Sequence, residues 1–225
     1  MKTTNLQARF DTAFNTLPLV AILRGIIPSE VAAIADKLYE CGFRLIEISL
    51  NSPDALESIS LLRRQLPPDA VVGAGTVLKV SAVQQVNDAG GSLIVMPHAD
   101  VNVISAAKHI GMICVPGAST LTEAFAAIHA GADALKLFPA ELITPAALKA
   151  MRSVLPSGLP LLPVGGINPA SMPDYIRAGA SGFGLGSALY SPGTDANTVG
   201  RRAAEFVAAW AALKATVAAP STTLD

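Results

Sequence analysis

Short apolar runs recur along the chain, and the longer stretches between them carry apolar residues at helical spacing. The eight runs cover residues 19–23, 45–50, 71–74, 93–96, 112–115, 134–138, 161–164 and 183–185. Their starts lie 19 to 27 residues apart, which is the length of a strand plus a helix and too regular for a sandwich of hairpins. The pattern therefore predicts an α/β protein in which eight parallel strands close into a (β/α)8 TIM barrel.

Residues that favour helix ends bound the stretches between these runs. Helix starts are expected at residues 28–30, 52–54, 97–100 and 120–123, where Pro, Ser, Thr or Asp precedes a helical pattern. Helix ends are expected where a glycine comes just before the next strand, at Gly42, Gly90, Gly111, Gly131 and Gly179. Such short crossovers are typical of a parallel sheet.

The two ends of the chain lie outside this repeat. Residues 5–15 predict an extra amphipathic helix that covers the barrel floor, and residues 196–218 predict a long alanine-rich final helix. Residues 219–225 are expected to form a frayed tail. Because no linker or change of composition interrupts the chain, we expect residues 1–225 to form a single domain.

Composition narrows the class of protein. Hydrophobic residues make up 51% of the chain and charged residues 15%, which favours a large buried core. The net charge is -1 without a basic run, so we expect no nucleic-acid partner. Cys41 and Cys114 match neither a disulfide framework nor a metal pair, and no apolar stretch suits a signal peptide or membrane span. A cytoplasmic protein without membrane contact is expected.

Candidate chemistry begins with a lysine in the run at residues 134–138. Strand alternation places Leu135 and Leu137 on one face and Lys136 on the other, toward the barrel interior. Burial among apolar neighbours should lower the pKa of Lys136 and favour the neutral amine that attacks a ketone to form an imine. The alternative is a structural lysine that reaches water or pairs with a carboxylate.

A carboxylate is expected in the same interior. In residues 45–50 alternation puts Ile46 and Ile48 on one face and Glu47 on the other. With Lys136, Glu47 would supply a nucleophile and a proton-transfer group in one cavity. A buried ion pair is the other interpretation of these two residues, and the two interpretations are compatible.

Glycine-rich loops follow the last two strands, where barrels often bind phosphate through backbone N–H groups. Gly165 and Gly166 follow the seventh run, and Gly186 with Ser187 follows the eighth. A phosphorylated small-molecule substrate is therefore expected. Arg24 and Thr76, at the ends of the first and third runs, could bind a second anion such as a keto-acid carboxylate.

No metal or cofactor is expected. The three histidines lack HxH or HExxH spacing, and no carboxylate cluster suits Mg²⁺. A phosphate-binding isomerase or synthase without an imine, and a silent barrel that only binds a sugar phosphate, remain alternatives at this point.

The strand ends resemble those of the bacterial class I aldolases that cleave 2-keto-3-deoxy-6-phosphosugar acids. The resemblance runs over about residues 19–209, and its motifs cover residues 45–48, 73–78, 116–120, 136–141 and 165–167. It implies that Lys136 forms the imine and that Glu47 is the general acid/base. It also implies that Thr76 touches the keto-acid end, that no cofactor is needed and that the protein is a homotrimer. The implied phosphate-binding residues are Gly165, Gly166, Gly186 and Ser187, and Ile167 and Ala188 are further expected substrate-binding residues.

Two subgroups of these aldolases differ in the configuration at C4 of the substrate, and the chain is similar to the galactonate subgroup. The gluconate subgroup usually has Arg where this chain has Asn51, and Thr where it has Val164. Arg24 matches the galactonate subgroup, as does Gly-Leu-Gly-Ser at residues 184–187. Because a valine cannot hydrogen-bond a sugar hydroxyl, Val164 is the candidate selector of the epimer.

The alternative substrates are the gluconate epimer and 4-hydroxy-2-oxoglutarate. Two departures from the galactonate subgroup bear on this choice. Ser49 stands where that subgroup often has Pro, and residues 138–141 look more like the gluconate form.

Overall fold

A computed structural model describes residues 2–218, and the tail expected at residues 219–225 lies outside them. The described helices are α1 (Lys2–Thr16), α2 (Pro28–Glu40), α3 (Ala55–Gln65), α4 (Val80–Asp88), α5 (Val101–His109), α6 (Leu121–His129), α7 (Pro145–Arg152), α8 (Met172–Arg177) and α9 (Ala196–Ala218). The strands are β1 (Leu19–Leu23), β2 (Leu45–Ser49), β3 (Val71–Gly75), β4 (Leu93–Val95), β5 (Ile113–Val115), β6 (Gly117–Ala118), β7 (Leu135–Leu137), β8 (Leu161–Pro163) and β9 (Phe183–Leu185).

Strands and helices alternate along the chain as the apolar pattern predicts, with one difference. The fifth run, which ends at Val115, forms β5, and a further short strand, β6, follows it after Pro116. Proline has no N–H to donate to a neighbouring strand, so the ladder is interrupted there. The carbonyl of Pro116 still accepts a hydrogen bond from the Lys136 N–H at 2.9 Å, which ties this segment to β7.

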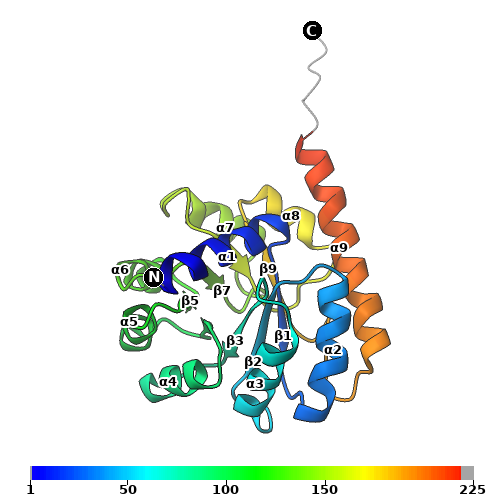
Figure 1. Ribbon diagram of the computed structural model, residues 1–225. Helices are drawn as coiled ribbons and strands as arrows, with labels where there is room; N and C mark the ends of the chain where they lie inside the picture. Colours follow the sequence, from blue (N-terminus) through cyan, green and yellow to red (C-terminus); the bar gives the residue numbers. More distant parts are fainter. Residues whose placement is uncertain (1, 219–225) are drawn as a thin grey trace.

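All the strand pairs are parallel. One sheet has six strands in the order β5-β4-β3-β2-β1-β9, and a second has three in the order β6-β7-β8. An isolated parallel bridge between Val164 and Gly184 joins the end of β8 to β9. Helices surround the strands, which gives the TIM-like parallel α/β architecture seen in Figure 1.

The two faces of the strands pack in different layers. One layer lies between strands and helices and includes Ile46, Ile48, Leu135 and Leu137. The inner layer lies on the opposite face and contains Val20, Leu45, Val71, Leu93, Val95, Ile113, Val115, Ala134 and Leu162. Lys136 and Glu47, which alternate with helix-facing residues, therefore lie on the inner face, in agreement with the strand alternation.

Local sequence explains the helix ends. The Asp100 side chain accepts hydrogen bonds from two N–H groups of α5, and Thr120 with Glu123 forms a capping box at the start of α6. The glycines expected after five of the helices all have positive φ, from 77° at Gly111 to 103° at Gly179. These caps bring the chain back to the sheet within a few residues.

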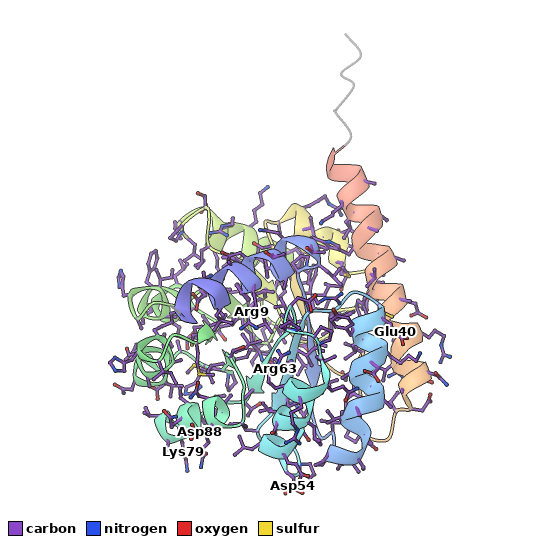
Figure 2. All side chains as sticks on the ribbon, in the orientation of Figure 1. Arg9, Glu40, Asp54, Arg63, Lys79 and Asp88 are labelled. Carbon is purple, nitrogen blue, oxygen red and sulfur yellow. The ribbon has the colours of Figure 1, made fainter. Side chains whose placement is uncertain are left out.

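Helix α1 packs against β2, β3 and β5. Phe10 and Phe14 join the inner layer, and Arg9 donates a hydrogen bond of 2.7 Å to the carbonyl of Pro68, in the loop before β3. Figure 2 shows Arg9 on the side of α1 that faces the strands, whereas Lys79 and Asp88 lie at the periphery of the molecule. Helix α1 thus covers the amino-terminal ends of the strands and leaves their carboxyl ends open.

Among the described residues, no helix is both long enough and apolar enough to cross a membrane.

Candidate active site

Lys136 lies at the centre of β7 and is only 4% exposed. Its Nζ atom is 5.0 Å from the centroid of the Phe138 ring, which lies two residues along on the same face. Burial lowers the pKa of Lys136, the charge of Glu47 opposes this shift, and the charge of Arg24 adds to it. The environment therefore favours a neutral, nucleophilic amine.

Glu47 lies on the inner face of β2 and is fully buried. Neither of its carboxylate oxygens has a hydrogen-bond partner among the described residues. Burial raises the pKa of Glu47, while the charges of Lys136 and Arg24 act in the opposite direction. A buried carboxyl group without a protein partner can exchange a proton with a ligand.

The Glu47 carboxyl group fits against the backbone of β3 because residue 75 is glycine. Ser49 pairs with Gly75 in the ladder between β2 and β3. A Cβ atom added to Gly75 would lie 2.6 Å from Cδ of Glu47, which is closer than real Cβ contacts. Gly75 therefore provides the space in which Glu47 lies.

Lys136 and Glu47 line the same inner cavity of about 20 Å³. Its other walls are apolar and include Phe10 and Phe14 of α1, Leu93 and Leu162. The pair is not among the ion pairs formed within 4.0 Å in the described part of the chain. The two groups thus influence each other's pKa in a mostly apolar enclosure without joining directly.

A larger cavity of about 580 Å³ opens at the carboxyl ends of the strands. Its volume suits a small-molecule ligand. Lys136 lies at its inner end, where Val164 and Gly184 line both this cavity and the inner one. The predicted binding residues that line the larger cavity are Arg24, Val164, Gly165, Gly166, Ile167, Gly186, Ser187 and Ala188.

The loops after β8 and β9 present backbone donors to this cavity. Gly165 and Gly166 have φ values of 112° and 62°, a conformation that glycine adopts readily. Within the described residues, the N–H groups of Gly166, Ser187 and Ala188 have no hydrogen-bond partner, whereas Gly165 directly follows the Val164–Gly184 bridge. Consecutive unpaired N–H groups of this kind form an anion-binding surface.

Arg24 and Thr76, the predicted binding residues for a second anion, are placed differently. Arg24 follows β1, lines the larger cavity and donates a hydrogen bond of 3.1 Å to the Asn51 side chain. Thr76 follows β3 and does not line either of these two cavities. Its φ of 57° is unusual for a β-branched residue, and such strain often marks a functional position.

The structure gives three residues a place in the site that the sequence does not predict for them. Gly75 makes room for Glu47, and Tyr190 lines the larger cavity while donating a hydrogen bond of 3.0 Å to Glu30. Glu141 also lines this cavity. A glycine at the end of a strand gives no sequence indication of which side chain it accommodates, and Tyr190 and Glu141 lie in irregular segments where alternation does not apply.

No group of three or more His, Cys, Asp or Glu side chains that could hold a metal ion occurs among residues that the structure describes.

Comparison with known proteins links this geometry to a family. The model of the family described as "Aldolase: KDPG and KHG aldolase" matches residues 10–201. A probable 2-dehydro-3-deoxy-6-phosphogalactonate aldolase of Rhizobium meliloti (strain 1021) is 44% identical over 196 residues, which cover 87% of this chain and 92% of the relative. The 2-dehydro-3-deoxy-6-phosphogalactonate aldolase of Escherichia coli (strain K12) is 43% identical over 194 residues, or 86% and 95% of the two chains.

A solved structure described as native KDPGal superimposes with a TM-score of 0.87 at 42% identity, covering 88% of this chain and 97% of that one. The resemblance inferred from the strand-end motifs is confirmed. The chain belongs to the KDPG and KHG aldolase family of class I aldolases, which are carbon–carbon lyases.

Proposed function

We propose that this aldolase cleaves 2-dehydro-3-deoxy-6-phosphogalactonate to pyruvate and D-glyceraldehyde 3-phosphate, with Lys136 as the imine-forming residue and Glu47 as the general acid/base. The observation that carries the proposal is that both side chains line one buried cavity at the inner end of a ligand-sized opening. The relatives named for this substrate support the choice.

Burial of Lys136 favours the first step of the reaction, because it favours the neutral amine. Its neutral amine attacks the C2 ketone of the substrate, and loss of water gives an iminium ion. Glu47 accepts the proton of the C4 hydroxyl, directly or through a water molecule, and the C3–C4 bond breaks. Its electrons move into the iminium ion, which becomes an enamine, and the aldehyde product leaves. Protonation at C3 and hydrolysis then release pyruvate and restore Lys136.

The two ends of the substrate suit different parts of the opening. The phosphate binds the loops that contain Gly165, Gly166, Ile167, Gly186, Ser187 and Ala188, whose unpaired N–H groups support this role. Arg24, held by Asn51, and Thr76 interact with the carboxylate at the keto-acid end. The charge of Arg24 also reaches Lys136 and Glu47, which supports a position beside the reacting atoms.

Val164 selects the configuration at C4. Its side chain lies between the Lys136 end of the opening and the glycine loop, because it lines both cavities and precedes Gly165. An apolar side chain there leaves a hydroxyl of the gluconate epimer without a hydrogen bond.

The proposal extends to the closure of the strands, the domain organisation and the oligomeric state. We propose that β5 and β6 act as one strand, so that the strands close into a (β/α)8 barrel across the Val164–Gly184 bridge, with α1 as an extra helix on its floor. The barrel is a single domain and assembles as a homotrimer. Cys41 and Cys114 are both free thiols, which supports a cytoplasmic setting.

Covalent trapping tests the imine. Borohydride added with pyruvate should fix one pyruvate-derived adduct on Lys136, which peptide mass spectrometry detects. Lys136→Met should lose the adduct, whereas Lys149→Met, at an exposed position on α7, should keep it. A folded protein that binds sugar phosphate but forms no adduct would instead be a silent binding barrel.

The proposed substrate is tested by comparing kcat/KM for the galactonate and gluconate epimers. The wild type should cleave the galactonate epimer with the higher kcat/KM, and Val164→Thr should shift the ratio toward the gluconate epimer by about tenfold, the scale of one hydrogen bond. A wild type that prefers the gluconate epimer would contradict the assignment.

A further inference from the structure

The carboxylate of Glu141 lies against the glycine pair to which the substrate phosphate is assigned. A Cβ atom added to Gly166 would be 3.2 Å from Cγ and 3.3 Å from Oε1 of Glu141. A Cβ atom added to Gly165 would collide with Oε2 of the same carboxylate. A negative charge of the protein thus lies at the loop whose unpaired N–H groups favour a negative charge of the ligand.

The backbone around Glu141 holds it at this place. The N–H of Ala140 donates to the carbonyl of Val164 at 2.9 Å, and the hydroxyl of Tyr175 donates to the carbonyl of Ala140 at 2.8 Å. The N–H of Leu142 donates to the carbonyl of Pro139 at 3.0 Å. These bonds fix the segment on both sides of Glu141 relative to the loop after β8.

The charge of Glu141 is not neutralised by a partner. Within the described part of the chain, its carboxylate has no hydrogen bond or ion pair. The residue is exposed, so the side chain is free to turn toward solvent. The charge of Glu141 also contributes to raising the pKa of Tyr175, after burial, which is consistent with a carboxylate close to this loop.

We infer that Glu141 is a specificity-determining residue that competes with the phosphate of the ligand for the glycine loop and lowers the preference for phosphorylated over unphosphorylated substrates. The inference rests on the proposed function of this site. A dianionic phosphate must displace the carboxylate or bind beside it against like-charge repulsion. An unphosphorylated hydroxyl end meets no such repulsion, and its O–H can donate to the carboxylate. The substrate class therefore extends to unphosphorylated 2-keto-3-deoxy sugar acids, which cleave to pyruvate and an uncharged aldehyde.

The test compares Glu141→Gln with the wild type in the aldol addition of pyruvate to D-glyceraldehyde 3-phosphate and to D-glyceraldehyde. Removal of the charge should lower KM for the phosphorylated aldehyde by about five- to tenfold and leave KM for D-glyceraldehyde unchanged or higher. The difference should shrink in about 0.5 M sodium chloride, because salt screens exposed charges. Glu205→Gln, at an exposed position on α9, is the matched control with the same change in net charge.

Binding of inorganic phosphate supplies a readout that does not depend on turnover. Isothermal titration calorimetry should give a dissociation constant for inorganic phosphate that is about fivefold lower for Glu141→Gln than for the wild type and for Glu205→Gln. Glu141→Ala should behave like Glu141→Gln, which guards against an effect of the new amide. Equal or weaker phosphate binding in both Glu141 variants would overturn the inference.

Failure of the proposed function is recognised separately. If wild-type Lys136 forms no pyruvate adduct, the aldolase assignment fails, whereas the titration with phosphate still decides the role of Glu141.

Discussion

At the scale of single residues, the charges of Glu47 and Arg24 shift the pKa of Lys136 in opposite directions, and this predicts how each charge affects the pH dependence of imine formation. The pKa of Lys136 lies below its usual value of 10.5, so the fraction of neutral amine rises with pH through a lower range than for a free lysine. Arg24→Met removes a charge that lowers this pKa and should move the pH profile of adduct formation upward. Glu47→Gln removes a charge that raises it and should move the profile downward.

The measurement is the rate of borohydride-trapped pyruvate adduct as a function of pH at saturating pyruvate, where the position of the profile on the pH axis, and not its height, follows the pKa of Lys136. Arg177→Met, a change of charge at an exposed position on α8, is the control and should leave the profile in place. Shifts of Arg24→Met and Glu47→Gln in the same direction would contradict the arrangement of charges.

Gly75 gives a second prediction at this scale. Gly75→Ala places a methyl group where the Glu47 carboxyl group lies and should displace it. Because the proposed proton-transfer group would be misplaced and the chemical step slowed, kcat for cleavage should fall by about 100-fold. Trapping of pyruvate on Lys136 should change much less.

The control is Gly158→Ala, since no atom lies within 4 Å of a Cβ at that position. It should leave both cleavage and trapping unchanged. A loss of trapping as large as the loss of cleavage in Gly75→Ala would indicate general disruption of the inner layer between the strands.

The candidate site illustrates what residue-level reasoning from sequence can reach. Lys136 and Glu47 lie on strands, where alternation determines which way a side chain points, and both point inward as predicted. Glu141 and Asn51 lie in loops, where no period applies and only the folded backbone brings them to Gly166 and Arg24. The inward direction of the strand residues was therefore predictable, and so were the glycine loops that line the larger cavity, whereas the contacts of Glu141 with Gly166 and of Asn51 with Arg24 were not.

At the scale of elements, helix α1 forms the floor of the cavity that holds Lys136. Phe10 is 4% exposed and lines that cavity together with Phe14. Phe10→Ala should lower the free energy of unfolding by about 3–5 kcal/mol, as for other buried aromatic residues. Water admitted through the floor should also weaken the burial effect on Lys136 and raise its pKa, so that adduct formation shifts to higher pH.

Urea unfolding and the trapping profile measure the two effects of Phe10→Ala. Asp11→Ala, on the exposed side of α1, should alter unfolding by less than about 0.5 kcal/mol and leave the profile unchanged. A destabilised Phe10→Ala with an unshifted profile would mean that α1 supports the fold without keeping the site dry.

Element positions were largely predictable because the apolar runs and the helix caps agree. The runs at residues 19–23 and 183–185 coincide with β1 and β9, and the final helix spans residues 196–218 as expected. The division of the fifth strand was not predicted, because the run ends at Val115 and the pairing of β6 depends on Lys136, far away in the sequence. Such long-range pairing leaves no local pattern.

At the scale of the whole molecule, exposed apolar side chains gather where three neighbouring helices begin. Val80, Val101 and Leu121 are the first residues of α4, α5 and α6, and Leu78 lies just before α4. Leu78 is 51% exposed and Val80 49% exposed. Figure 1 shows α4, α5 and α6 following one another along one side of the molecule, and a cluster of this kind is typical of a subunit interface.

The proposed homotrimer then predicts a mass in solution of three chains, as measured by analytical ultracentrifugation. Val80→Glu combined with Val101→Glu should convert the trimer to single chains, because two charges per subunit would be buried without partners. Each glutamate stands at the first position of a helix, where a negative charge is tolerated, so the subunit itself should remain folded and Lys136 should still trap pyruvate. Val154→Glu, at a residue that is 53% exposed outside this cluster, should leave the trimer intact. A double variant that keeps the mass of three chains would locate the interface elsewhere, and a wild type that sediments as a single chain would refute the trimer itself.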